Sequence, residues 1–143
     1  MILPPTIHGT AVALAGRAVL LVGPSGSGKS DLALRLIDRG ATLVADDRVI
    51  LTRTGGRVLA SAPPAIAGLI EVRGIGLVPV PHVDHVPVAL VVDLAAPRER
   101  LPSAATRDVS GVAVPAVALN AVAASAVLLV ERALAMLGTT NRR

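Results

Sequence analysis

The sequence predicts a mixed α/β fold, and three features of the chain support this prediction. A short apolar run at residues 18–22 comes directly before a glycine-rich segment, as at the end of a buried strand. Leucine and isoleucine then recur at positions 32, 36 and 37, the spacing of one helix face. Residues 123–137 form a second helical segment that ends before Gly138. We therefore expect a mixed sheet with flanking helices.

The other elements follow from apolar runs and from the residues that interrupt them. The first helix is predicted from Lys29 to Arg39, because Gly40 is a typical C-terminal stop. Gly55-Gly56 lies between two apolar runs and predicts a hairpin turn, and Pro63-Pro64 breaks the chain after it. The predicted strands are residues 18–22, 41–45, 49–54, 57–62 and 86–94.

Composition restricts the class of protein. The 143 residues predict one domain, residues 1–143, and 52% of them are hydrophobic, which excludes a disordered chain. Cysteine is absent, so disulfides and thiolate metal sites are excluded. Aromatic residues are absent too, and the basic residues, with a net charge of +4, are scattered. A nucleic-acid partner is therefore not expected.

One uncharged stretch, residues 109–130, has the length of a membrane span. It is interrupted by Pro115 and Asn120 and has no aromatic belt, so we expect a buried strand followed by a packed helix. The first five residues lack the basic start of a signal peptide. No membrane association and a cytoplasmic location are expected.

A complete phosphate-loop motif follows the first predicted strand. Its glycines would let the backbone approach a phosphate, and the following helix would direct its positive end to the same place. Lys29 is the only lysine of the chain and would reach the outer phosphates, whereas the Ser30 hydroxyl would hold Mg²⁺. The motif does not define the reaction, because ATPases, GTPases and kinases share it. Its residues are Gly23, Pro24, Ser25, Gly26, Ser27, Gly28, Lys29 and Ser30.

Two adjacent acids, Asp46 and Asp47, follow the second predicted strand. Carboxylates beside a phosphate loop commonly serve Mg²⁺ or act as a base. Neighbouring residues at a strand end point in different directions, so we expect separate roles. One would accept a proton from an attacking hydroxyl and the other would orient its neighbours. A solvated turn is the alternative.

Histidines occur in two places. His8, in the segment His8-Gly9-Thr10, is placed before the first strand, and the sequence leaves a structural and a catalytic role equally open. His82 and His85 lie in a proline- and valine-rich segment, for which we expect an exposed loop rather than a metal site.

The apolar run at residues 69–80 contains two charges, Glu71 and Arg73. On a strand they would project to the same face, which would set a Mg²⁺ ligand beside a phosphate-binding guanidinium. Gly74 and Gly76 would permit close approach of a ligand. An internal salt bridge at a strand edge is the alternative.

Taken together, these segments resemble the catalytic domain of the HPr kinase/phosphorylase family over residues 5–101. The segments are His8-Gly9-Thr10, GPSGSGKS, Ala45-Asp46-Asp47 and Glu71-Val72-Arg73-Gly74-Ile75-Gly76. The resemblance implies Mg²⁺-dependent phosphorylation of a serine of the phosphocarrier HPr by ATP or pyrophosphate. It also implies reversal by inorganic phosphate, and a fold related to that of phosphoenolpyruvate carboxykinase.

The family's functional residues carry over as follows. Asp47 matches the proton acceptor, His8 and Lys29 match further active-site residues, and Ser30 and Glu71 match the Mg²⁺ ligands. Residues 71–80 match the signature segment. Supporting roles are expected for Arg73, Gly74 and Gly76 in that segment and for Asp46 outside it. Arg100 is the candidate for a later catalytic arginine.

The chain also departs from the family pattern. It resembles the short members that consist of the catalytic domain only; long members form hexamers, and a homo-oligomer is the expectation here. The segment linked to dephosphorylation falls at residues 114–119, VPAVAL, without arginine. Without aromatic residues, adenine would be held by aliphatic contacts or arginine. The alternative functions are a small-molecule kinase or NTPase, and a non-catalytic nucleotide-sensing module.

Overall fold

The computed structural model describes residues 5–96 and 105–140 and confirms the mixed α/β class. The strands of these ranges are β1 (Thr6–His8), β2 (Thr10–Leu14), β3 (Arg17–Val22), β4 (Thr42–Ala45), β5 (Arg48–Thr54), β6 (Arg57–Ser61), β7 (Leu69–Val72), β8 (Gly76–Pro79), β9 (Val86–Asp93), β10 (Thr106–Val109) and β11 (Val112–Ala118). The helices are α1 (Lys29–Asp38) and α2 (Ala126–Leu137), and a 3₁₀ turn spans Pro64–Ile66.

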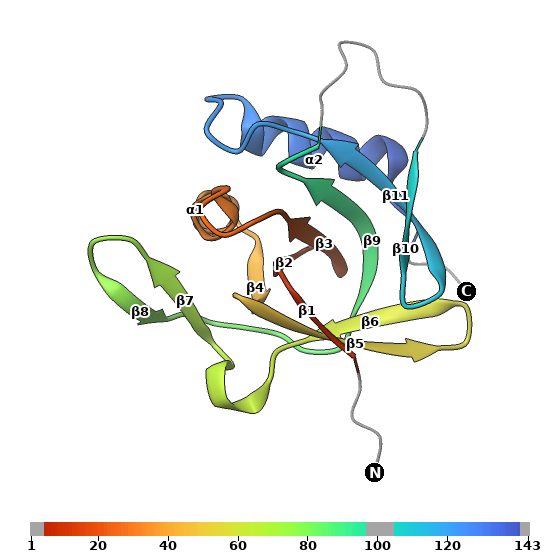
Figure 1. The fold of residues 1–143 in the computed structure, drawn as a ribbon, viewed down its shortest axis with the longest axis horizontal. Coiled ribbons are helices and arrows are strands. Elements are labelled where there is room, and N and C mark those ends of the chain that lie inside the picture. Colours follow the sequence, from red (N-terminus) through yellow and green to blue (C-terminus); the bar gives the residue numbers. More distant parts are fainter. Residues whose placement is uncertain (1–4, 97–104, 141–143) are drawn as a thin grey trace.

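The main sheet brings several strand ends to one edge. Its order is β1-β5-β6-β9-β3-β2-β4, and β11 joins beside β9. Strands β3, β9 and β11 are parallel, whereas β2 runs antiparallel to both β3 and β4. The carboxyl ends of β3, β4, β9 and β11 therefore meet at the edge where β2 begins (Figure 1). Parallel sheets commonly bind ligands at such an edge.

Apolar side chains pack on both faces of the sheet, which explains why β3 and β9 are continuous apolar runs. One face carries α1 and α2, and its core includes Leu21, Leu36, Leu90 and Val130. Strands fold over the opposite face of the sheet, and the core on that face includes Leu20, Val22, Leu51, Val91 and Val109. Figure 1 shows α1 and α2 on one side of β3 and β9, with β1, β5 and β6 on the other.

Most predicted elements are confirmed to within one or two residues at their ends. The strands at 18–22, 41–45, 49–54, 57–62 and 86–94 correspond to β3, β4, β5, β6 and β9, and the helix at 29–39 corresponds to α1. Gly55 has a φ of +62° in the hairpin between β5 and β6, and Gly40 has a φ of +114° after α1. Glycine adopts such positive φ values readily, which fits the hairpin turn and the helix stop predicted at these positions.

Three details of the prediction are wrong. His8 does not precede the first strand, because β1 ends at His8 and β2 begins at Thr10. The C-terminal helix begins at Ala126 rather than Ala123, since residues 120–126 form turns closed by Ala123 N–H to Asn120 O and Ala126 N–H to Ala123 O. Finally, residues 69–80 are not one strand but the hairpin β7–β8.

The uncharged stretch at residues 109–130 is divided between strand β11 and the beginning of α2, as predicted. Across residues 5–96 and 105–140, no helix has the length and apolarity needed to cross a membrane. Arg100 lies outside the described residues.

Candidate active site

The glycine-rich loop joins β3 to α1 and is wrapped around its own lysine. The Lys29 ammonium donates hydrogen bonds to Gly23 O at 2.8 Å and Pro24 O at 3.0 Å, and the residue is only 7% exposed. Ser27 N–H closes the loop by donating to Pro24 O at 3.1 Å. The loop thus holds its one ammonium close to where a bound phosphate would need a cation.

The loop is tightly packed, and one of its buried groups fits a bound phosphate. The Ser27 hydroxyl is buried and has no hydrogen-bond partner among the described residues. A buried hydroxyl without a partner is costly, and a phosphate oxygen is an acceptor it could use. Gly23 and Gly28 have no room for a side chain, since a Cβ would lie 2.7 Å from Ser27 Oγ and 2.9 Å from Ala121 Cβ, respectively.

Asp46 is the centre of a buried hydrogen-bond cluster. Its Oδ1 accepts from Ser30 Oγ at 2.7 Å and from Thr10 Oγ1 at 2.9 Å, and its Oδ2 accepts from Glu71 N at 2.8 Å. The residue is 4% exposed. One carboxylate therefore fastens β2, the start of α1 and the β7–β8 hairpin together, and it orients the Ser30 hydroxyl that the sequence assigned to Mg²⁺.

Asp47 points the other way, as the sequence analysis predicted for two adjacent strand-end residues. Its side chain is 72% exposed, and its Oδ1 lies 3.1 Å from His8 Nε2. Its φ is +71°, a left-handed conformation that Asp tolerates better than most residues. Its carbonyl oxygen accepts from Gly9 N at 3.1 Å, which ties it to the junction of β1 and β2. Asp47 is thus an accessible carboxylate on a fixed backbone.

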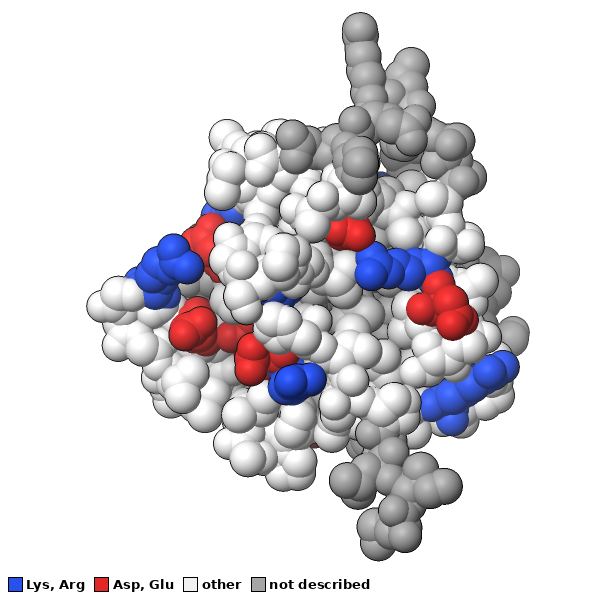
Figure 2. Space-filling model, in the orientation of Figure 1, with Lys and Arg blue, Asp and Glu red and all other residues white. Residues whose placement is uncertain are grey.

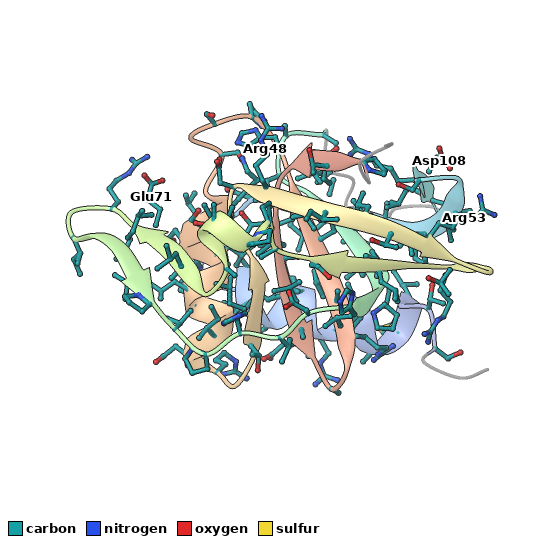
Figure 3. The ribbon with its side chains drawn as sticks, turned by 90° about the horizontal axis from the view of Figure 1, so that it is seen from below. Arg48, Arg53, Glu71 and Asp108 are labelled. Atoms are coloured by element: carbon teal, nitrogen blue, oxygen red, sulfur yellow. The ribbon has the colours of Figure 1, made fainter. Side chains whose placement is uncertain are left out.

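Glu71 and Arg73 are not side by side on a strand. Glu71 lies in β7 opposite Leu77, whereas Arg73 lies in the turn that Val72 and Gly76 close. Gly74 and Gly76 have φ values of +89° and +119°, and no atom lies within 4 Å of a Cβ built on either. Their positive φ angles suit the turn, and the close approach of a ligand to these two glycines stays a prediction. Figure 3 shows Glu71 on the hairpin, far from Asp108 and Arg53.

The other sequence candidates are placed as follows. His82 and His85 lie in an exposed segment before β9, and the Nδ1 of His85 lies 3.2 Å from Ser61 Oγ. The described residues contain no group of three or more His, Cys, Asp or Glu side chains arranged to hold a metal ion. Most of VPAVAL lies in β11, where Ala116 pairs with Val91.

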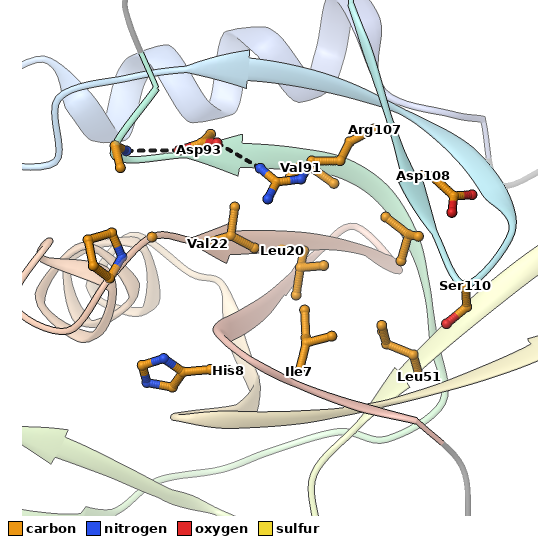
Figure 4. Close-up of a pocket in the computed structure, with 14 residues that line it drawn as sticks. Ile7, His8, Leu20, Val22, Leu51, Val91, Asp93, Arg107, Asp108 and Ser110 are labelled. Atoms are coloured by element: carbon orange, nitrogen blue, oxygen red, sulfur yellow. Dashed lines mark hydrogen bonds and ion pairs between the residues drawn. The ribbon is translucent and has the colours of Figure 1, made fainter.

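A pocket of about 510 Å³ beside the loop was not predicted from the sequence (Figure 4). Asp93, the last residue of β9, lies on one of its walls and pairs with Val22, the residue before the glycine loop. Its Oδ2 accepts from Arg107 Nη1 at 2.7 Å, and its Oδ1 accepts from Ala95 N and Ala96 N at 2.8 and 2.9 Å. The sequence signal that could have revealed Asp93 is its position as an acid at the end of the apolar run of β9.

Asp93 has a perturbed pKa. Burial alone would raise the pKa, but the N–H groups of Ala95 and Ala96 and the Arg107 guanidinium outweigh burial and lower the pKa below its usual value. Asp93 is therefore held as a carboxylate at neutral pH.

Another ion pair connects α1 and α2. The Arg39 guanidinium donates to both carboxylate oxygens of Glu131, each at 3.0 Å, and this hydrogen bonding raises the pKa of Arg39.

On the face drawn in Figure 2, acidic and basic side chains are interspersed rather than gathered into one basic area.

Comparison with known proteins places the chain in a family. The sequence profile described as "HPr Serine kinase C-terminal domain" matches residues 3–137. Proteins named HPr kinase/phosphorylase from Bordetella pertussis and Clostridium tetani are 51% and 45% identical to the chain over 73 and 75 residues. These segments cover 50% and 52% of this chain but only 24% and 25% of the relatives.

The fold has a close counterpart among solved structures. The structure titled "Structure of the Hpr(Ser) kinase/phosphatase from Coxiella burnetii" matches with a TM-score of 0.80 at 27% sequence identity. The match covers 92% of this chain and 88% of that one.

Proposed function

The chain belongs to the HPr Serine kinase C-terminal domain family, and from this premise we propose that it is a phosphotransferase acting on a serine of an HPr-type phosphocarrier protein. The proposed donor is ATP, or pyrophosphate, with Mg²⁺. One observation carries the proposal: an accessible carboxylate, Asp47, contacts His8, and His8 lines one pocket together with the start of the glycine loop that holds Lys29. The named relatives and the matched structure support the same class of reaction.

The donor side of the proposed reaction uses the loop and the residues behind it. Lys29 would exchange its two carbonyl partners for phosphate oxygens, and Ser27 would gain an acceptor for its hydroxyl. Ser30 and Glu71 are the proposed ligands of Mg²⁺, which when bound neutralises charge on the donor phosphates. Asp46 holds both of these ligands, through the Ser30 hydroxyl and the Glu71 backbone N–H.

On the acceptor side, the proposed base is Asp47. Its carboxylate would take the proton of the serine hydroxyl while the serine oxygen forms a bond to the terminal phosphorus of the donor. The bond from that phosphorus to the bridging oxygen breaks, and ADP, or phosphate in the case of pyrophosphate, leaves. His8 orients Asp47 through its Nε2 contact. In the reverse direction the protonated Asp47 would return the proton to the serine oxygen.

A transfer assay tests this proposal. Purified protein, MgATP and an HPr-type carrier are incubated, and the intact mass of the carrier is measured, with a carrier whose target serine is replaced by alanine as the control. We expect one phosphate per carrier, and none on the alanine carrier or with the Lys29→Ala protein. The same assay with pyrophosphate identifies the donor, and addition of inorganic phosphate afterwards tests reversal.

The outcome that contradicts the proposal is an unmodified carrier when the protein is folded and binds nucleotide. Consumption of ATP without carrier modification would instead favour a small-molecule kinase or NTPase. Nucleotide binding without any turnover would favour a sensing module.

A further inference from the structure

The pocket of about 510 Å³ lies beside the residues of the proposed reaction. It lies on the face of β3 and β9 that α1 and α2 do not cover, and its lining also includes residues of β1, β5 and β10 (Figure 4). His8 lines it together with Gly23 and Pro24, the first two residues of the glycine loop. His8 also contacts Asp47 at 3.1 Å, so one residue connects this pocket to the proposed base.

The pocket has an aliphatic floor and a charged far end. Its floor is formed by Ile7, Leu20, Val22, Leu51, Val91 and Val109. Arg107 is already neutralised by Asp93 at 2.7 Å. Asp108, in contrast, is exposed, and its side chain makes no hydrogen bond or ion pair with any described residue. Arg53 approaches the neighbouring Gly111 but donates to Gly55 O rather than to Asp108.

These charges decide which kind of acceptor fits. Two carboxylates and one guanidinium line the pocket, so these three side chains together carry a net negative charge. An anionic metabolite would meet this charge and find the one cation already paired. A chain segment with aliphatic side chains and a basic side chain would cover the floor and pair with Asp108. The volume exceeds that of one side chain and suits several residues of an acceptor protein.

We infer that this pocket is the acceptor cleft, and that Asp108 selects an acceptor protein with a basic side chain near the phosphorylated serine. The inference rests on the proposed function and deepens it. The serine hydroxyl would lie at the His8 end of the cleft, and the flanking residues would extend over the aliphatic floor toward Asp108. Arg107 and Asp93 form the wall between these two ends.

Charge reversal at the far end of the cleft tests the inference. With the phosphocarrier as the acceptor, Asp108→Lys should raise the KM for the carrier by about tenfold at low ionic strength, because like charges would face each other. The difference should shrink as salt is added, since salt screens exposed charges. The affinity for nucleotide, measured separately by calorimetry, should not change.

Asp38→Lys is the matched control. Asp38 is an exposed acid at the end of α1, on the helix side of the sheet, and its replacement changes the net charge by the same amount. This variant should keep the KM of the unaltered protein. An equal rise in KM for both variants would show only a general charge effect and would overturn the inference, as would an unchanged KM for Asp108→Lys.

A second variant tests occupation of the cleft without charge. Ala95 is exposed and lines the end near the glycine loop, so Ala95→Phe adds a ring to the cleft without disturbing the core. We expect a higher KM for the carrier at unchanged nucleotide affinity. Wild-type transfer with an unchanged KM in both Ala95→Phe and Asp108→Lys would contradict the cleft while leaving the proposed function intact. Failure of the unaltered protein to modify the carrier would overturn both.

Discussion

Asp46 and Asp47 are adjacent in the chain and have the same side chain, yet the fold gives them opposite environments. Asp46 is 4% exposed and accepts three hydrogen bonds, from β2, α1 and β7. The Asp47 side chain is 72% exposed and contacts one partner, His8. A buried carboxylate that accepts three hydrogen bonds stabilises the structure, whereas one that faces solvent is free to take a proton. The comparison therefore separates the residue that builds the site from the residue that we propose performs the chemistry.

Removal of the Asp46 carboxylate should have the largest effect on stability. In Asp46→Ala, the donors of Thr10, Ser30 and Glu71 lose their acceptor in a buried place, so we expect the free energy of unfolding to fall by about 3 kcal/mol. Urea denaturation followed by circular dichroism measures the change. A loss below about 0.5 kcal/mol would mean that the cluster does not fasten the three elements.

Disruption of the exposed His8–Asp47 pair should lower the rate of phosphoryl transfer and leave the stability nearly unchanged. His8→Ala removes the one contact of the Asp47 carboxylate, so we expect the rate of phosphoryl transfer to fall by about tenfold through loss of positioning. The free energy of unfolding should change by less than about 0.5 kcal/mol, because both side chains face solvent. Single-turnover kinetics and urea denaturation of the same preparation test both statements. A large loss of stability would assign His8 a structural role.

Thr10→Val sharpens the comparison inside the buried cluster. Valine has nearly the shape of threonine, and the change removes one of the three donors to Asp46 while the residue stays fully buried. We expect the free energy of unfolding to fall by about 1 kcal/mol. Thr6→Val, at an exposed position of β1, is the control and should leave it nearly unchanged. Equal effects of the two variants would mean that the Thr10 hydroxyl does not stabilise the buried cluster.

The smallest effect concerns acid pH. The pKa of Asp93 is lowered in the folded state, so its contribution to stability is complete above the ordinary value of 3.8 and is lost as the pH falls through the folded-state pKa. The difference in unfolding free energy between the unaltered protein and Asp93→Asn should be constant near neutral pH. It should shrink below pH 3.8. Thermal unfolding scans over acid pH measure this difference, and a difference that grows toward acid pH would reverse the assigned sign.

The sequence predicted the parts of the site that depend on local patterns. The strand, loop and helix around Lys29 follow from an apolar run, glycines and helical spacing within a single segment. The divergence of Asp46 and Asp47 follows from the alternation of side chains at a strand end. These features need no knowledge of distant residues.

The features that the sequence did not predict depend on pairing between distant segments. Arginine and glycine at positions 73 and 74 fit an extended strand as well as a turn, and only the pairing of Glu71 with Leu77 decides for the turn. Strand β1 has three residues and is defined by its pairing with β5. The Asp93–Arg107 wall joins two strands that do not pair with each other directly. The proposed acceptor side of the site therefore depends on tertiary contacts.

The most direct test of the central claim is a comparison of nucleotide binding and phosphoryl transfer in Asp47→Asn. Asparagine tolerates the left-handed conformation at this position, where φ is +71°, so the backbone should be preserved. The account predicts that nucleotide affinity stays within about twofold, while single-turnover transfer to the carrier falls by about a thousandfold through loss of the base. Transfer at the unaltered rate, or a loss of nucleotide binding that accounts for the loss of transfer, would contradict the role of Asp47.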